Sequence, residues 1–168
     1  AWLRTKGVEN LRVDRSTANL IRDFYRIPRP SDPDLSLVTQ YEAMLAEGVS
    51  LDDHDPQDLY DDFLRDPRDH GSALAMAGLL RQIWSGELLN EKHTAILKAI
   101  MKRCLTGANR LSGNLPAHAL PISHKTGSIG GTIDDAGVMD MPNGDQVVIV
   151  VYTSGPAAES GAMKEKAI

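Results

Sequence analysis

The stretch from residue 122 to residue 153 most constrains the fold, because it reads as short strands joined by tight turns. Residues 122–126 and 132–141 each favour a strand. Pro142-Asn143-Gly144-Asp145 follows, and an Asn-Gly pair between extended runs is a strong hairpin signal. Residues 146–153 are mostly β-branched, which predicts a strand buried on both faces. Because tight turns join antiparallel neighbours, we expect a three-stranded antiparallel meander.

Two well-patterned helices are predicted before this meander. Residues 72–84 begin at Ser72, a favourable N-cap, and their apolar positions are Leu74, Ala77, Leu80, Ile83 and Trp84. Residues 91–105 carry a second stripe at spacings of three and four, formed by Ile96, Leu97, Ile100, Met101, Cys104 and Leu105. Weaker helical patterns fall on residues 1–6, 35–47 and 156–168. Helices flanking an antiparallel sheet indicate an α+β fold with the helices packed on the sheet.

The segment between residues 8 and 69 is less patterned. Residues 8–34 hold three prolines and read as a loop with at most a short helix. Residues 51–69 are strongly acidic, but they lack the glycine turn and terminal bidentate glutamate of a calcium loop. We therefore interpret these aspartates as a solvated surface with helix caps.

Composition excludes several classes of partner. The formal net charge of -5 argues against a surface for nucleic acid or anionic membranes. The one cysteine, Cys104, excludes an internal disulfide, and its apolar helical setting favours a buried structural thiol. No apolar run is long enough to span a bilayer. The five histidines lack a zinc-ligand spacing, so we expect neither a metal nor another cofactor.

Lys125-Thr126-Gly127, on the first predicted strand, is the motif that carries chemistry. Lys125 supplies a compact positive charge that attracts an anionic substrate. Thr126 offers a hydroxyl to a substrate carboxylate, and Gly127 lets a substrate lie against the strand edge. The backbone N–H of Ser128 can donate to an oxyanion. The alternative is a surface lysine on a sheet edge, with glycine in a turn.

This motif resembles a signature of the serine β-lactamases and penicillin-binding proteins. The resemblance extends to the C-terminal half of class A β-lactamase-related serine hydrolases: residues 11–15 resemble the Ω-loop entry, 66–69 its exit, and 106–116 the stretch before Lys-Thr-Gly. It implies the C-terminal part of a β-lactamase/DD-peptidase-like fold. Residues 1–168 would form one incomplete domain with a long Ω-loop-type insertion at about 22–64.

The resemblance also assigns roles to individual residues. It implies catalytic roles for Lys125 and Ser128, and substrate-binding roles for Thr126, Gly127 and Arg110. It pairs Arg15 with Asp69 to close the Ω-loop; for Arg110 the alternative is a solvent-exposed arginine at a helix end. The implied protein is a periplasmic or secreted, monomeric serine hydrolase that acts on a β-lactam or D-Ala peptide through an acyl-enzyme.

Three departures from the family pattern qualify this assignment. No serine has a lysine three positions on, so the nucleophile is expected upstream of Ala1, in a longer protein. Ser112-Gly113-Asn114 matches a Ser-x-Asn motif but lies too close to Lys125, and we interpret it as a decoy. Thr17 occupies the place of the general-base glutamate, and a hydroxyl cannot take a proton from water as a carboxylate does. A penicillin-binding DD-peptidase-like enzyme and a non-catalytic binding module therefore remain alternatives.

Overall fold

The computed structural model describes residues 2–28, 36–46, 54–115, 121–158 and 165. The chain divides into two compact units, which are described separately. Ala1–Arg12 with His70–Ile168 form the first, called here the sheet unit. Val13–Asp69 form the second, called the loop unit, and they include the whole insertion expected at about 22–64.

Three antiparallel strands form the sheet in the order β1-β2-β3, as the sequence predicted. They are β1 (Ile122–Ile129), β2 (Thr132–Asp140) and β3 (Gln146–Ser154). At the predicted hairpin the Met141 N–H donates to the Asp145 carbonyl at 2.8 Å. The expectation that the third strand is buried on both faces is wrong. Strand β3 is an edge strand of this sheet, and all its residues are exposed or half-buried.

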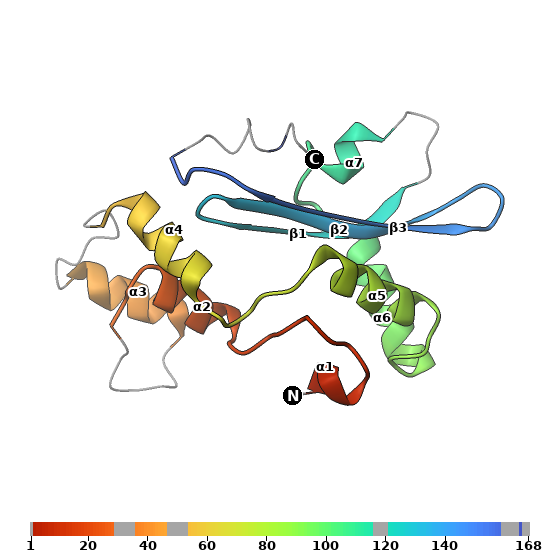
Figure 1. Cartoon of the computed structure of the whole chain (residues 1–168), viewed down its shortest axis with the longest axis horizontal. Coiled ribbons are helices and arrows are strands. Elements are labelled where there is room, and N and C mark those ends of the chain that lie inside the picture. The colour runs from red at the N-terminus through yellow and green to blue at the C-terminus, as the bar shows by residue number, and fades with distance from the viewer. Residues whose placement is uncertain (1, 29–35, 47–53, 116–120, 159–164, 166–168) are drawn as a thin grey trace. The chain divides into compact units, whose positions relative to one another are not determined.

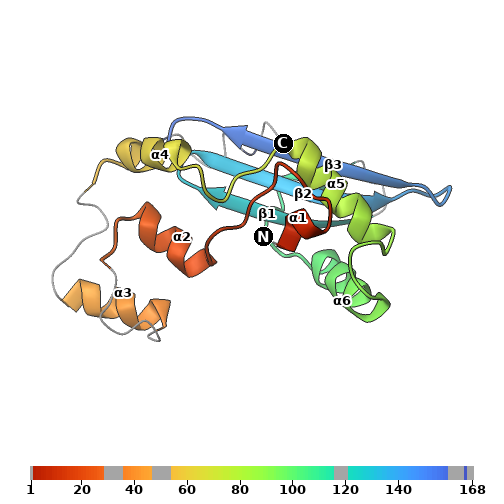
Figure 2. The same cartoon turned by 60° about the horizontal axis from the view of Figure 1, so that its bottom comes forward.

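Helices lie on both faces of the sheet (Figure 1, Figure 2). Helices α5 (Ala73–Trp84) and α6 (Glu91–Lys102) cover one face, and the short α7 (Leu111–Asn114) lies on the other. The Ser72 side chain caps α5 by accepting the Ala75 N–H at 3.1 Å. The core between helices and sheet contains Leu80, Ile83, Trp84, Leu88, Met101, Ala136 and Val138. Burying each large apolar side chain contributes about 1.5–3 kcal/mol, which fixes the helices to the sheet.

Parts of the predicted helical stripes do not reach this core. Leu74 is 83% exposed because it projects roughly 120° around the helix from Leu80, outside the buried arc. Helix α6 ends at Lys102 rather than 105, and Leu105 is 95% exposed. Cys104, beyond the helix end, is half-buried rather than buried. Both predicted apolar stripes therefore extend beyond the parts of the helices that are buried against the sheet.

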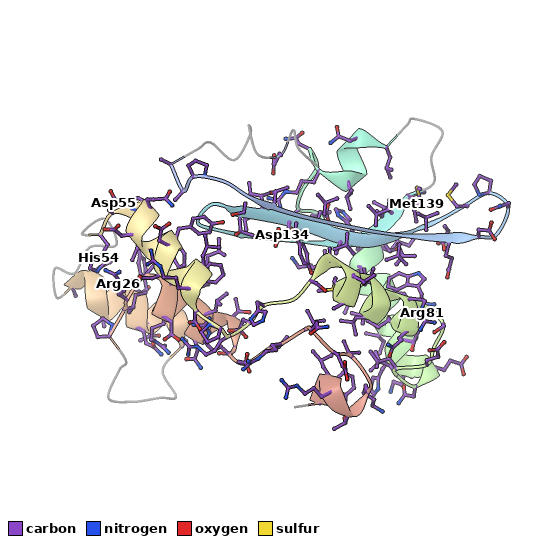
Figure 3. All side chains as sticks on the ribbon, viewed as in Figure 1. Arg26, His54, Asp55, Arg81, Asp134 and Met139 are labelled. Atoms are coloured by element: carbon purple, nitrogen blue, oxygen red, sulfur yellow. The ribbon has the colours of Figure 1, made fainter. Side chains whose placement is uncertain are left out.

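The loop unit contains three helices. They are α2 (Thr17–Phe24), α3 (Leu37–Ala46) and α4 (Pro56–Arg65). In α2, within the predicted loop, the Ser16 hydroxyl caps the first turn. In α4, within the acidic run, Asp55 accepts the N–H groups of Gln57 and Asp58 (Figure 3). The aspartates of this run thus include the helix cap that the sequence indicated.

Two remaining expectations concern the chain's first turn and its last helix. The predicted N-terminal helix is present as α1 (Trp2–Thr5), and Gly7 follows it with a positive φ of 72°. The helix predicted over residues 156–168 falls mainly outside the described residues, of which Glu165 alone is helical there. None of the described helices is both long and apolar enough to cross a membrane.

Candidate active site

The Lys-Thr-Gly motif lies in the middle of β1, at one margin of the sheet. Lys125 pairs with Ala136, a core residue packed against α5 and α6, so its side chain leaves the strand on that face. Lys125 is exposed, and its Nζ donates to the Thr126 carbonyl at 2.6 Å. Thr126 and Ser128 leave β1 on the opposite face, because side chains alternate along a strand. The motif thus presents its ammonium and its hydroxyls on different faces.

Arg110 joins this motif from the segment just before α7. Its side chain is 8% exposed, so the alternative of a solvent-exposed arginine is wrong. Nη1 donates to the carbonyls of Gly127 and Asp134, at 3.0 Å each, and Nη2 donates to Ser128 Oγ at 2.7 Å. Nε lies 3.1 Å from a carboxylate oxygen of Glu165. The structure therefore brings Arg110, Gly127 and Ser128 together around one guanidinium.

The Thr126 hydroxyl lies in a short chain of polar side chains. Its Oγ1 is 2.5 Å from the Thr106 Oγ1, which is 3.3 Å from the Cys104 Sγ. Gly107 is needed here, because its φ is +75° and an added Cβ would lie 2.5 Å from the Thr126 methyl carbon. Sequence reasoning did not identify Thr106, whose approach to Thr126 depends on tertiary structure.

The Ser112-Gly113-Asn114 segment has local structural roles in α7. The Ser112 hydroxyl donates to the Gly107 carbonyl at 3.1 Å. The Asn114 side-chain amide donates to the carbonyls of Asn109 and Arg110. Such side-chain bonds to nearby backbone satisfy helix termini and turns. They account for these residues without a catalytic role, in agreement with their interpretation as a decoy.

A buried histidine–aspartate pair lies beside the motif and was missed from the sequence. His124, on β1, is 3% exposed and Asp135, on β2, is fully buried. The His124 Nδ1 is 2.9 Å from both carboxylate oxygens of Asp135. One of those oxygens also accepts the Leu111 N–H at 3.3 Å. Two consecutive aspartates, Asp134 and Asp135, in a predicted strand necessarily point to opposite faces, so one of them had to face the interior; this was the signal that could have revealed the pair.

Asp134 is the one carboxyl among the described residues for which a strongly raised pKa is found (Figure 3). Burial against β3 raises the pKa of Asp134 to about 6, although the Thr153 N–H and the Arg110 charge act in the opposite direction. Burial, and then the charge of Asp134, also raise the pKa of Tyr152, its partner across the sheet. The group is consequently sensitive to mildly acidic pH.

The loop unit holds the Arg15–Asp69 pair inside a larger ion cluster. Arg15 Nε is 2.5 Å from Asp69 Oδ2, and Nη1 lies 3.0 Å from Asp23 and 3.1 Å from Asp66. Burial alone would raise the pKa of Asp69, but hydrogen bonds from Arg15 and from backbone N–H groups lower it overall. A hydrogen bond from Arg68 is the main cause of the lowered pKa of Asp66. The cluster therefore joins the two ends of the loop unit.

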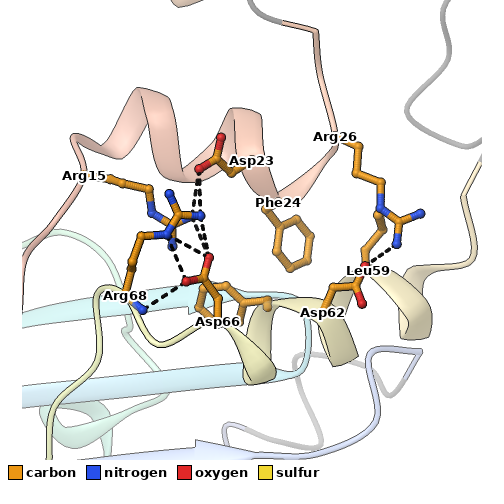
Figure 4. Close-up of a pocket in the computed structure, with 9 residues that line it drawn as sticks. Arg15, Asp23, Phe24, Arg26, Leu59, Asp62, Asp66 and Arg68 are labelled. Carbon is orange, nitrogen blue, oxygen red and sulfur yellow. Dashed lines mark hydrogen bonds and ion pairs between the residues drawn. The ribbon is translucent and has the colours of Figure 1, made fainter.

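A pocket opens beside this cluster, between α2 and α4 (Figure 4). Its wall combines the charged cluster with apolar side chains, among them Phe24, Leu59 and Phe63. The Arg15 Nη2 is buried and has no hydrogen-bond partner among the described residues.

Thr17, in the place expected for a general base, is the first residue of α2. In the described parts of the chain, no three His, Cys, Asp or Glu side chains gather as a metal ion would require.

Comparisons with known proteins agree with this fold. The VEB-1 β-lactamase of Pseudomonas aeruginosa is 34% identical over 88 residues, or 49% of this chain and 29% of that protein. The crystal structure of the TLA-3 extended-spectrum β-lactamase matches with a TM-score of 0.64 at 20% identity, over 98% of this chain and 48% of that one. A mutant of PBP-A, in an acyl-enzyme complex with penicillin G, matches with a TM-score of 0.51 at 32% identity, over 58% of this chain and 37% of that one.

The family itself follows from a match to the whole chain. The chain spans 29% to 49% of the length of the curated relatives it matches. The model of the beta-lactamase enzyme family matches residues 1–168. Both the α+β fold and the resemblance to class A β-lactamase-related serine hydrolases are thereby confirmed. This chain belongs to the beta-lactamase enzyme family.

Proposed function

We propose that the intact protein is a serine hydrolase that acts on β-lactams through an acyl-enzyme. Its nucleophile would be supplied by sequence upstream of Ala1, because no serine of this chain has a lysine three positions on. The observation that carries the proposal is the Lys125-Thr126-Gly127 strand with Arg110 held against it. The acyl-enzyme complex of a PBP-A mutant with penicillin G supports the same chemistry for the intact protein.

In this proposal β1 forms one wall of the substrate site. Lys125 attracts the anionic substrate as an exposed point charge on one face of the strand, and the Thr126 hydroxyl, on the opposite face, donates to the substrate carboxylate. Arg110 adds positive potential close to the same strand, since its guanidinium touches Gly127 and Ser128. The Ser128 N–H is one donor to the oxyanion that develops as the β-lactam carbonyl is attacked. No cofactor is needed for these steps.

Thr17 favours slow release of the acyl group, and so a second candidate function. If Arg15 and Asp69 close an Ω-type loop, the residue two positions after Arg15 is the one that would activate the deacylating water. A threonine there cannot act as a carboxylate base. A penicillin-binding DD-peptidase-like enzyme, whose adduct with penicillin is long-lived, fits that feature. A non-catalytic binding module, which would show no turnover at all, is the third candidate.

The wider context of the proposal follows the family analogy. Residues 1–168 would be part of one β-lactamase-like domain, with an Ω-loop-type insertion at about 22–64. The intact protein would be a periplasmic or secreted monomer whose ligand is a small β-lactam or D-Ala peptide. The 168-residue chain alone would be inactive, because no serine in it has a lysine three positions on. It would also be poorly stable, because it exposes apolar side chains such as Ile96 and Ile100 on α6.

Acylation of the intact protein tests the proposal. Incubation with labelled penicillin should add the mass of one penicillin, and Lys125→Ala should slow that addition at least tenfold. Lys92→Ala, which removes an exposed lysine of α6, is the matched control and should leave the rate unchanged. Absence of any adduct on the intact wild-type protein would exclude the proposed enzyme and leave the binding module.

Thr17→Glu separates the two enzymatic candidates. If the missing carboxylate limits deacylation, this substitution should shorten the lifetime of the penicillin adduct by tenfold or more. An adduct that is already short-lived in the wild-type protein would favour an efficient β-lactamase with a different base. The adduct lifetime, followed by intact-protein mass spectrometry after removal of free penicillin, decides between them.

A further inference from the structure

We propose that the buried His124–Asp135 pair is a positioning device that fixes the Lys125 strand and the Arg110 segment relative to each other. The inference rests on the proposed function for its catalytic consequence, because that function gives substrate contacts to both cations. Neither His124 nor Asp135 reaches solvent, so both act through the backbone that they hold.

The first half of the device fixes β1. The His124 Nδ1 lies 2.9 Å from both oxygens of Asp135, so a hydrogen bond joins the two buried side chains. The two residues are diagonal neighbours across β1 and β2, because His124 pairs with Gly137 and Asp135 with Thr126. The bond therefore resists sliding and splaying of β1 at the residue immediately before Lys125.

Gly137 makes room for this arrangement. An added Cβ at Gly137 would lie 2.7 Å from both the His124 Cβ and the Ser123 carbonyl oxygen. Contacts this short do not occur between real side chains and backbone, so a larger residue would displace β1. Gly137 therefore permits the close approach of β2 to the backbone of β1 at His124.

The second half of the device fixes Arg110. Asp135 accepts the N–H of Leu111 at 3.3 Å, and Leu111 directly follows Arg110. Arg110 in turn donates to the Gly127 carbonyl and the Ser128 hydroxyl of β1. One carboxylate thus anchors both sides of the contact between Arg110 and the motif. Loss of the pair should let the two cations move independently.

Two variants of the intact protein and one control test the inference. The double variant His124→Phe/Asp135→Leu removes both polar side chains, and apolar replacement of a buried pair is often neutral for stability. His124→Asn keeps an N–H group near the position of Nδ1 and should therefore retain the contact with Asp135. His93→Asn, at an exposed histidine of α6, is the control.

Amide hydrogen exchange is the structural readout. In the double variant, protection should fall at least tenfold for residues 110–112 and 124–128, while residues 147–151 of β3 keep theirs. His124→Asn and His93→Asn should leave all three segments protected. A uniform loss over the whole sheet would reduce the pair to general stabilisation and overturn the inference, as would unchanged protection in the double variant.

Acylation by labelled penicillin is the functional readout. A displacement of about 1 Å in catalytic groups costs on the order of a hundredfold in rate, so the double variant should acylate about a hundred times more slowly. His124→Asn should recover most of that loss. If the wild-type protein forms no adduct, the proposed function fails, and hydrogen exchange still decides whether the pair positions the two segments. Selective loss of protection with an unchanged acylation rate would overturn the catalytic part.

Discussion

The two units each bury an arginine, but the two arginines have different partners. In the loop unit the guanidinium of Arg15 lies among the carboxylates of Asp23, Asp66 and Asp69. In the sheet unit the guanidinium of Arg110 contacts two backbone carbonyls, a hydroxyl and the carboxylate of Glu165. Arg15 thus has three carboxylate partners, two of which it shares with Arg68, whereas Arg110 has one carboxylate partner, Glu165, and otherwise neutral acceptors.

This difference separates a structural use of arginine from a use suited to ligands. A buried cation surrounded by anions holds chain segments together, and its removal breaks several ion pairs at once. A cation with one carboxylate partner and otherwise neutral acceptors keeps more of its potential, which an anionic substrate can use. The comparison thus favours the proposed roles, closure of the loop for Arg15 and electrostatic attraction for Arg110.

The largest effect is expected for Arg15→Ala. The substitution removes the ion partner of Asp69, whereas Asp23 and Asp66 keep Arg68. Loss of this buried cation should destabilise the loop unit by about 3–5 kcal/mol. Hydrogen exchange of α2 and α4 amides in the intact protein measures this loss. Arg65→Ala is the matched control, because Arg65 pairs with Asp61 and Asp62 at the surface, where such pairs contribute less than about 1 kcal/mol. Equal effects of the two substitutions would contradict the structural role of Arg15.

The next effect is expected for Arg110→Lys. A lysine keeps the charge but lacks the planar fork that reaches two carbonyls and a hydroxyl at once. We expect a loss of about 2 kcal/mol, seen as exchange of the β1 and α7 amides, together with slower acylation by penicillin. The loop unit should keep its protection, because its ion cluster is unchanged. Full retention of both readouts would show that charge alone suffices at this position.

The sequence predicts an element of either unit when its signal is local, and it fails when the element depends on tertiary contacts. The three strands were predicted because the Asn143-Gly144 turn and the β-branched run are local features. Burial of β3 was overestimated because composition does not tell an edge strand from a central one. In the loop unit, α2 lies where the sequence pattern indicates mainly loop, although Ser16 is a favourable N-cap residue.

In the candidate site too, the contiguous motif is predictable from the sequence and the long-range contacts are not. The Lys-Thr-Gly motif is contiguous, and it is found by inspection of the sequence. The contacts of Arg110 with Gly127 and Asp134 span 17 and 24 residues, and no periodicity predicts them. The His124–Asp135 pair depends on strand register, since a slip of one residue would turn one side chain to the other face. The motif residues and, through the family resemblance, Arg110 were accessible from the sequence, whereas the contacts that hold them in place were not.

Acid should affect the two units in opposite directions. Asp134 has a pKa raised to about 6 from 3.8, so the folded sheet unit binds its proton more tightly than the unfolded chain. That unit should gain stability as pH falls from about 6 to 4, by roughly 1 kcal/mol once solvent screening of a half-buried group is allowed for. Asp66 and Asp69 have lowered pKa values, so the loop unit keeps its stability above about pH 4 and loses it below.

Asp134→Asn isolates the contribution of the sheet unit to this pH dependence. The variant should show no gain in protection of β2 and β3 amides between pH 6 and pH 4, while the loop unit should still lose protection below about pH 4. Asp140→Asn, at an exposed end of β2, is the control for the loss of one carboxylate. A wild-type sheet unit that weakens over this interval would contradict the assignment to Asp134.

The smallest effect is expected from salt. Arg26–Asp62 and Arg65–Asp62 are exposed ion pairs of the loop unit, and raising the ionic strength to 1 M shortens the Debye length to about 3 Å. We expect the loop unit to lose about 0.2–0.5 kcal/mol, because exposed pairs contribute little and are screened. The contacts of Arg110 with backbone carbonyls are buried and should not respond. Amide exchange of α4 and β1, measured at 0.1 M and 1 M salt with Arg65→Ala as the control, tests this expectation. A larger response of β1 than of α4 would mean that the potential around Arg110 depends on exposed ions rather than on its neutral partners.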